Sequence, residues 1–134
     1  MNLEEMKVVI PIHTSGYFAT VEDDKADIRG WQFQFIEDGK IYFCTSNKKD
    51  VYQQLQKNPN CAFSCNAGGY AFRIRGKAIM VTDKEVISNI HASIDKNVAE
   101  VYPTPEDNGF AVFYLENGEV KYSRNFVSFE RFTF

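Results

Sequence analysis

Two segments of the chain carry side chains suited to binding an anion. Arg29 lies in a stretch whose alternating pattern predicts a strand, and a polar cluster further on contains Thr45, Ser46, Lys48 and Lys49 just before a predicted helix. The first N–H groups of a helix have no partner within the helix and lie at the positive end of its dipole, so they bind anions. These residues together suit the phosphate of a bound ligand.

The positions of the two lysines favour a functional reading. Lysine complements the dipole at the C-terminal end of a helix, so Lys48 and Lys49 at the beginning cost roughly a few tenths of a kcal/mol each unless an anion offsets them. The alternative is that both lysines are solvated surface charges and that Arg29 pairs with an acidic neighbour. The residues alone leave both interpretations open.

Hairpins and short helices must position these side chains. Asp38-Gly39 and Asn117-Gly118 predict hairpin turns because glycine tolerates the positive φ that a primed turn needs. Asn47 or Ser46 can cap the helix that Asn58-Pro59 ends, and a Thr82–Glu85 capping box opens the next one. The expected strands are 16–22, 26–36, 40–45, 60–67, 70–81, 110–115, 119–124 and 127–134, and the expected helices are 3–10, 48–57, 82–91 and 95–101.

Composition points to one mainly β domain. The chain has 134 residues, of which 15% are aromatic, and aromatic side chains pack well on pleated surfaces. Frequent glycine-containing turns between short strands predict an antiparallel barrel, closed or split, because a barrel removes exposed strand edges. We therefore expect a single domain over 1–134, β with inserted helices.

Charge and cysteine content narrow the classes of protein. The net charge of −3 argues against a nucleic-acid-binding protein, which needs a basic surface. No apolar run is long enough to cross a membrane, and the N-terminus does not resemble a signal peptide. Cys44, Cys61 and Cys65 lie in predicted strands without a second Cys/His pair, which predicts reduced thiols and no metal site. These features together predict a cytoplasmic protein.

Other reactive side chains form no recognisable catalytic pattern. His13 and His91 are the only histidines, and surface or capping roles are the simplest reading of both. Arg73 and Arg75 alternate along one strand face, either as a salt-bridged exterior or with Arg73 near a cofactor or a dimer interface. No nucleophile motif, phosphate-binding loop or carboxylate pair is present, so the catalytic residues stay unknown and any chemistry would belong to a cofactor.

Three blocks resemble a known family. In order and spacing, GYFATVEDDKADIRGWQF, DGKIYFCTSNKKDVYQQLQKNP and FRIRGKA are similar to the pyridoxamine 5'-phosphate oxidase-like family of FMN-binding split barrels. The resemblance implies a six- to seven-stranded split barrel that forms a homodimer, with FMN at the interface.

The resemblance also implies roles for individual residues. Arg29 corresponds to the strand arginine that reaches the flavin phosphate. The backbone that borders the isoalloxazine ring corresponds to Gly30, Trp31 and Gln32, the hydroxyl segment beside the ribityl-phosphate to Thr45 and Ser46, and the basic pair that closes over the phosphate to Lys48 and Lys49.

Departures from the long members of the family restrict the substrate. Gln34 replaces a lysine, Ala71 replaces a glutamine, and the ending SFERFTF lacks the Arg- and His-containing segment that grips the phosphate of the substrate. These departures argue against vitamin B6 oxidation. The resemblance then implies an FMN-dependent oxidoreductase that transfers a hydride or electrons between reduced nicotinamide, NADH or NADPH, and a small-molecule acceptor. The alternative is a non-catalytic flavin- or haem-binding barrel.

Overall fold

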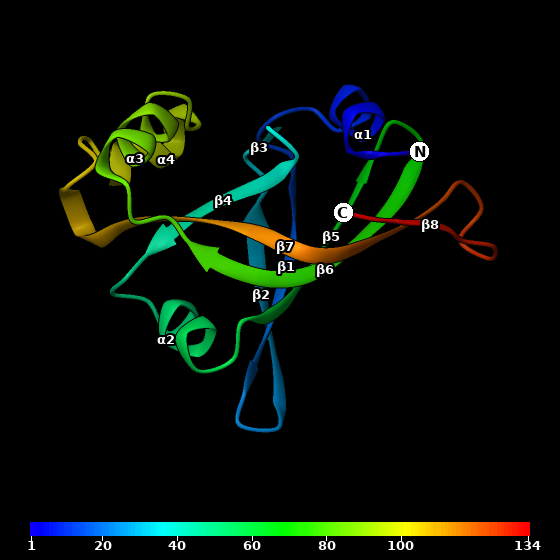
Figure 1. The fold of residues 1–134 in the computed structure, drawn as a ribbon, viewed down its shortest axis with the longest axis horizontal. Helices are drawn as coiled ribbons and strands as arrows, with labels where there is room; N and C mark the ends of the chain where they lie inside the picture. Colours follow the sequence, from blue (N-terminus) through cyan, green and yellow to red (C-terminus); the bar gives the residue numbers. More distant parts are fainter.

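The fold is one antiparallel β sheet that curls into an incomplete barrel. The computed structural model describes all 134 residues. Figure 1 shows the curved sheet with its helices placed around it, and the strand order is β2-β1-β5-β6-β7-β4-β3, with β8 paired to β7. The strands are β1 Ser15–Glu22, β2 Lys25–Gln32, β3 Phe35–Glu37, β4 Lys40–Ser46, β5 Asn60–Ala67, β6 Tyr70–Met80, β7 Phe110–Ser123 and β8 Glu130–Thr133. The predicted mainly β, split-barrel fold is confirmed, with eight strands in the sheet.

Four short α-helices lie outside the sheet. They are α1 Leu3–Val9, α2 Asp50–Lys57, α3 Lys84–His91 and α4 Lys96–Val101, and a 3-10 turn, η1 Asp107–Gly109, precedes β7. Asp83 rather than Thr82 caps α3, because its carboxylate accepts the N–H groups of Glu85 and Val86. In Figure 1, α3 and α4 lie together at one end of the barrel and α2 lies at another. No helix is long and apolar enough to cross a membrane.

The strand expected over 26–36 is interrupted, because the chain changes partner there. β2 pairs with β1 as far as Gln32, whereas β3 pairs with β4 from Phe35. Between them, the Phe33 N–H donates to the Thr14 carbonyl at 2.8 Å and the Gln34 N–H donates to the Tyr42 carbonyl at 3.3 Å. This corner carries the chain from one edge of the sheet to the other.

The two strands expected over 110–115 and 119–124 are one strand. Asn117 and Gly118 do not reverse the chain but lie in a bulge opposite Gly76, where the register with β6 shifts between Arg75 and Lys77. Asn117 has a φ of 50°, which a bulge accommodates as readily as a turn does. The backbones of Gly118 and Phe134 exchange two hydrogen bonds of 3.0 Å, so the end of the chain extends the sheet here.

Aromatic side chains fill the barrel. Phe18, Phe43, Phe63 and Phe113 are at most 1% exposed and form a continuous set of edge-to-face and stacked contacts. Gly16 allows β1 to approach β5, because a Cβ there would lie 2.2 Å from the Ser64 carbonyl oxygen. A second, smaller cluster joins the outer face of β4 and β7 to α3 and α4, and its buried members are Tyr42, Ile90, Tyr102, Phe110 and Val112.

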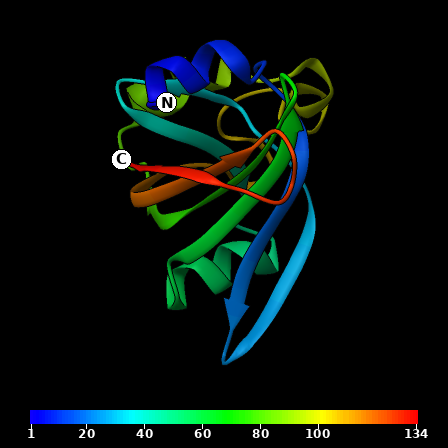
Figure 2. The same cartoon turned by 90° about the vertical axis from the view of Figure 1, so that its right-hand side faces the viewer.

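The barrel stays open between β2 and β4. β3 and β4 pair only from Phe35 to Glu37 on one side and from Lys40 to Tyr42 on the other, after which β4 is paired to β7 alone. β2 and β4 are therefore not paired to each other, and a wedge-shaped gap lies between their facing edges. Figure 2 shows the opposite end of β1 and β2, where their hairpin extends past the barrel beside α2.

Candidate functional site

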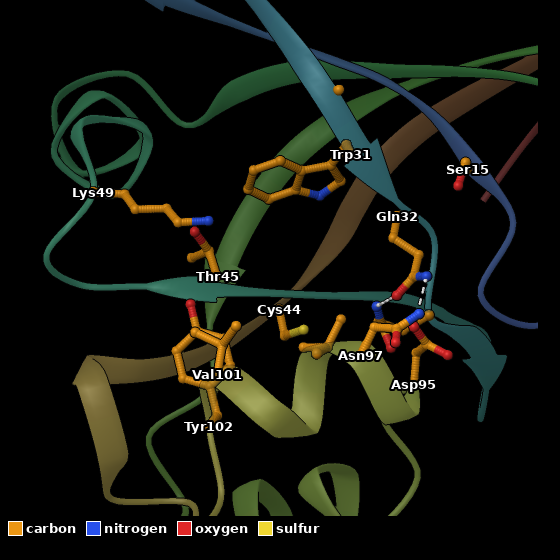
Figure 3. A pocket seen from close by; sticks show the side chains of 13 residues that line it. Ser15, Trp31, Gln32, Cys44, Thr45, Lys49, Asp95, Asn97, Val101 and Tyr102 are labelled. Carbon is orange, nitrogen blue, oxygen red and sulfur yellow. Dashed lines mark hydrogen bonds between the residues drawn. The ribbon is translucent and has the colours of Figure 1, made fainter.

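A cavity of about 460 Å³ occupies the wedge between β2 and β4. We call it the split cavity, and its walls are residues 30–32 of β2, Cys44 and Thr45 of β4, Lys49 before α2, and one side of α4. Figure 3 shows Trp31 on one wall, Thr45 and Cys44 along β4, and Val101 and Tyr102 at the α4 side. The volume lies within the range of small-molecule sites, about 300–1,000 Å³.

Three buried side-chain atoms, each on a residue that lines the split cavity, have no hydrogen-bond partner. They are Trp31 Nε1, Gln34 Oε1 and Thr45 Oγ1, and no other buried side-chain nitrogen or oxygen in the chain lacks a partner. Gln34 is 1% exposed and Thr45 is 2% exposed. Burial of a polar group without a hydrogen bond costs about 1–3 kcal/mol, so three such atoms around one cavity indicate a place that a polar ligand fills.

The two ends of the split cavity differ in charge. At one end the Lys49 ammonium lies 5.8 Å from the centroid of the Trp31 ring. At the other end Gln32 Nε2 donates to Asp95 Oδ2 at 3.3 Å. Figure 3 shows Lys49 and Asp95 on opposite sides of the cavity, with Trp31 and Thr45 between them. A bound molecule would therefore meet a cation at one end and a carboxylate at the other.

The β2 wall of the split cavity is accessible at Gly30. Gly30 lines the cavity, and a Cβ added there would meet no atom within 4 Å. The next residue, Trp31, stacks on Phe18 with ring centroids 4.9 Å apart and planes 23° apart, which fixes the indole ring. A planar ligand can thus approach the strand backbone beside a rigid aromatic side chain.

The predicted site residues divide into two groups. Those that line the split cavity are Gly30, Trp31, Gln32, Thr45 and Lys49. Arg29, Ser46 and Lys48 do not line it.

Arg29 belongs to a separate polar network beneath α2. Its guanidinium donates to Thr20 Oγ1 at 2.7 Å, to Asp27 Oδ2 at 2.8 Å and to Gln54 Oε1 at 3.0 Å. Gln54 Nε2 in turn donates to Glu22 Oε2 at 2.9 Å and to Asp27 Oδ2 at 3.0 Å. We call these five residues the Arg29 network. Arg29 pairs with the neighbouring Asp27, as the alternative interpretation of the sequence expected.

The Arg29 network fastens α2 to the sheet. Gln54 of α2 and Thr20 of β1 are 4% and 2% exposed, and their side chains are hydrogen-bonded to each other. The hydrogen bond from Gln54 and the charge of Arg29 lower the pKa of Asp27 below its usual value, although partial burial acts against them. Through this network Arg29 stabilises the helix that Lys49 precedes.

Ser46 and Lys48 form the turn that leads into α2. Ser46 Oγ donates to the Asn108 carbonyl and accepts the Lys48 N–H at 3.1 Å. Because α2 begins at Asp50, both lysines precede the helix, and its first turn contains an acidic residue. The expected helix start at Lys48 is therefore two residues too early, and Lys49 is the N-cap residue of α2. No side-chain hydrogen bond caps α2 at Lys49, so neither Ser46 nor Asn47 caps it as expected.

Each of the two histidines is hydrogen-bonded to the backbone of a distant segment. The His13 ring is hydrogen-bonded through Nε2 to the Ser93 carbonyl at 2.9 Å, and the His91 ring through Nε2 to the Tyr102 carbonyl at 2.6 Å. Neither lines the split cavity. Arg75 forms an ion pair with Glu119 at 3.2 Å, and the Arg73 guanidinium lies 4.4 Å from the Phe129 ring centroid.

Several residues of the cavity were not predicted as a site. Cys44 lines it, but burial raises the pKa of its thiol to about 12, so the thiol stays protonated at neutral pH. Asp95, Asn97 and the apolar side of α4 reach the cavity only because α3 and α4 fold back over β4 and β7. Gln34 stood out in the sequence only as a departure from a family lysine. No local motif marks the residues of α4.

Comparisons with known proteins agree with this architecture. The model of the family described as pyridoxamine 5'-phosphate oxidase matches residues 3–124. A NimC/NimA family protein from Clostridium acetobutylicum has a similar structure, with a TM-score of 0.82, 23% identity and coverage of 97% of this chain and 91% of that one. No curated protein sequence matches significantly.

Two further similar structures bind different groups. One is a pyridoxamine 5'-phosphate oxidase-related, FMN-binding protein from Nostoc punctiforme, with a TM-score of 0.67, 12% identity and coverage of 90% of this chain and 86% of that one. The other is a haem-binding protein from Mycobacterium smegmatis, with a TM-score of 0.68, 16% identity and coverage of 90% and 53%. At these identities the likeness shows a shared fold.

Proposed function

This chain belongs to the pyridoxamine 5'-phosphate oxidase family, and from that premise we propose that it binds FMN in the split cavity and is an FMN-dependent oxidoreductase. The observation that carries the proposal is the set of three unpartnered buried atoms around one cavity. Buried polar atoms that already have hydrogen-bond partners gain nothing from a ligand. These three atoms have none, so a ligand that supplies their hydrogen bonds offsets the free-energy cost of burying them.

The residues of the cavity fit FMN. The Lys49 ammonium suits the phosphate, because a charge-assisted hydrogen bond contributes about 1.5–3 kcal/mol. The indole N–H of Trp31 and the hydroxyl of Thr45 suit the acceptor atoms along the flavin and ribityl chain. Gly30 leaves room for a planar ring beside the strand. Arg29 stays a proposed phosphate contact, although its guanidinium would have to leave its present partners to reach a phosphate in the cavity.

The protein supplies position and exclusion of water, and FMN supplies the redox chemistry. When bound, FMN carries out hydride or electron transfer at its N5 atom. Lys49 would hold the phosphate, Trp31 would fix the ring against the strand, and the apolar side of α4 would exclude water. Reduced nicotinamide is the proposed electron donor and a small molecule the proposed acceptor, and the departures at Gln34 and Ala71 argue against oxidation of a vitamin B6 phosphate.

A homodimer with FMN at its interface fits the outer face of the sheet. Tyr17 and Ile28 are 63% and 66% exposed, and register places Ile28 on the same face of β2 as Gly30. A second copy that covers this face would also cover the open side of the split cavity. A cytoplasmic location is likewise proposed, since all the cysteines are free thiols.

The alternative functions differ in their support. A haem-binding function would need an axial ligand, and both histidines already bond backbone carbonyls outside the split cavity. A flavin-binding protein without turnover uses the same residues as the oxidoreductase. Anaerobic addition of NADH or NADPH separates the two: bleaching of the bound flavin supports the enzyme, and an unchanged flavin spectrum supports the non-catalytic protein.

An FMN titration tests the cofactor proposal. We expect the purified protein to show a flavin absorbance spectrum, or to quench the fluorescence of added FMN with 1:1 binding per chain. Lys49→Ala should weaken FMN binding about ten- to a hundredfold. Lys57→Ala at the far end of α2 is the matched control and should leave the affinity unchanged. A colourless protein that does not bind added FMN would refute the proposal.

A further inference from the structure

The outer face of β6, β7 and β8 carries a row of three cations. In the register of the sheet Arg73 lies opposite Lys121, and Lys121 lies opposite Arg131. These strands are neighbours in the sheet (Figure 1), and side chains that alternate with the row, such as Phe72 and Val120, are buried in the barrel. Like charges directly opposite each other destabilise a sheet, so this row favours a partner that brings negative charge.

A single carboxylate offsets part of this charge. Glu119 lies between the cations and forms three ion pairs, with Arg75 at 3.2 Å, Lys121 at 3.8 Å and Arg131 at 3.6 Å. We call this surface the cationic face, and its cations are Arg73, Arg75, Lys77, Lys121 and Arg131. It has five cations for one carboxylate, whereas the whole chain has a net charge of −3.

Two hollows in the surface join these cations into one track along β6. Both hollows are lined by Arg75 and Glu119, so they are continuous with each other. The smaller one, of about 220 Å³, extends to Arg73 and Lys121, and the larger one, of about 510 Å³, extends to Lys77. A strand rises about 3.4 Å per residue, so Arg73 and Arg75 lie about 7 Å apart along it. A single compact anion cannot reach all of these cations, whereas a linear polyanion can.

The shape of the cationic face and its aromatic contact favour a flexible polyanion with planar groups. The face lies on the outside of a sheet that curls into a barrel, so it is convex and a straight, rigid duplex cannot follow it. The Arg73 guanidinium lies 4.4 Å from the centroid of the Phe129 ring and is exposed, so it can also stack on an unpaired base. Asn60 and Asn117 line the larger hollow and add amide groups that can hydrogen-bond to bases.

We propose that the cationic face binds single-stranded nucleic acid, with phosphates in the track and an unpaired base against Arg73. Arginine suits phosphate oxygens because its guanidinium donates two parallel hydrogen bonds. The net charge of −3, which argued against such a partner, averages over the whole surface and does not describe this face. The site is independent of the split cavity, and β5 separates it from the proposed dimer face at Tyr17 and Ile28.

Fluorescence anisotropy of a labelled oligothymidylate of about 12 nucleotides measures this binding. At about 50 mM salt we expect a dissociation constant of about 10 µM or tighter. The logarithm of the affinity should fall with the logarithm of the salt concentration with a slope of about −2 to −3, since each of three or four phosphates contributes about −0.7. Unchanged anisotropy, or an affinity that does not depend on salt, would overturn the proposal. So would a duplex of the same length, or inorganic polyphosphate of matched charge, that binds as tightly as the oligothymidylate or more tightly.

Substitutions locate the binding on the cationic face. Arg73→Gln and Lys121→Gln should each weaken binding about fivefold at about 50 mM salt and make the slope less steep by about 0.7. Arg73→Lys keeps the charge and should restore the slope, which a misfolded variant would not do. Glu119→Gln removes the competing carboxylate and should strengthen binding about threefold or more.

A matched control removes the same charge elsewhere. Lys84→Gln, in the exposed first turn of α3, should leave the affinity within about twofold and the slope unchanged. Equal losses in Lys84→Gln and Arg73→Gln would show that the attraction belongs to no particular face and would overturn the proposal. Neither outcome bears on FMN, because the oligothymidylate titration is read without the flavin spectrum.

Discussion

The Arg29 network and the split cavity are both polar regions of an aromatic barrel, but only the first is saturated. In the Arg29 network every buried side-chain nitrogen and oxygen has a partner, and the charges of Asp27 and Arg29 lie 2.8 Å apart. In the split cavity Trp31, Gln34 and Thr45 each keep one buried atom without a partner. Both regions join β2 to a neighbouring element, so their place in the fold does not explain why only one of them has buried polar atoms without partners.

The comparison separates two uses of buried polar side chains. A saturated network offers nothing to a ligand and serves to fix one element on another, here α2 on β1. Buried polar atoms without partners destabilise the ligand-free protein, and a ligand that forms hydrogen bonds with them offsets that cost. On this physical criterion the split cavity is the better candidate for a ligand site, and Arg29 contributes first to the stability of α2. The predictions below test whether the two regions really differ in this way.

The largest effect should come from loss of the central amide of the Arg29 network. Gln54→Leu removes the donor to Glu22 and Asp27 and the acceptor for Arg29, which should lower the free energy of unfolding by about 2–3 kcal/mol. Urea unfolding measures it. Gln53→Leu, at the exposed neighbouring position, should change stability by less than about 0.5 kcal/mol. Equal effects of the two substitutions would mean that the network does not stabilise α2.

The next effect should appear in binding and not in stability. Gly30→Val places a side chain where the structure has open space, so the fold should keep its free energy of unfolding. The same side chain would obstruct a planar ligand, and FMN should bind at least about tenfold more weakly, or about 1.4 kcal/mol. FMN fluorescence quenching measures this loss. Ala26→Val, on the same face of β2 but away from the cavity, is the control, and similar FMN affinity in both variants would move the ring away from Gly30.

A pair of threonines should respond with opposite signs. Thr45→Val removes a buried hydroxyl that has no partner, so the FMN-free protein should become about 1 kcal/mol more stable. Thr20→Val removes a hydroxyl that bonds both Gln54 and Arg29, and should cost about 1–2 kcal/mol. Thermal or urea unfolding of the FMN-free variants gives both values. Destabilisation by Thr45→Val to the same degree as by Thr20→Val would remove the distinction between the two regions.

The smallest effect should be a difference in pH dependence. The pKa of Asp27 lies below its value of 3.8 in the unfolded chain, mainly because Gln54 and Arg29 stabilise the carboxylate. Its contribution to stability is therefore complete above the unfolded pKa and is lost as the pH falls through the folded pKa. Asp27→Asn should make the loss of stability between about pH 5 and pH 2 less steep. An unchanged slope would mean that Asp27 is not held by the Arg29 network in solution.

Local signals in the sequence predicted most of the elements but not how they pair. The strands β1, β4 and β5 and the helix stop at Asn58-Pro59 were predicted from signals between neighbouring residues, and the structure confirms these elements. Asn117-Gly118 gave the same local signal as a hairpin turn, yet it lies in a bulge within β7, because β6 pairs with that strand both before and after the bulge. The local sequence favoured a positive φ at Asn117, and the pairing of distant strands placed that residue in a bulge and not in a turn.

The site was predicted in part for the same reason. Thr45 and Lys49 were identified from their types and their place before a helix, Trp31 was identified from the family resemblance, and the structure brings all three to one cavity. Asp95 could not be found, because its approach to Gln32 depends on the packing of α3 and α4 over β4. The sequence alone could not decide between the two interpretations of Arg29, since its partners Thr20 and Gln54 are brought together only by the packing of α2 against β1.

By itself the sequence determined the mainly β class, the family and the residue types available for an anion. The class and the residue types follow from composition and periodicity, which are local, and the family follows from the resemblance of three sequence blocks to known members. Only the tertiary structure decided which polar atoms are satisfied and which are not, because a hydrogen bond between residues such as Gln32 and Asp95 depends on distance in space. That distinction separates the Arg29 network from the split cavity.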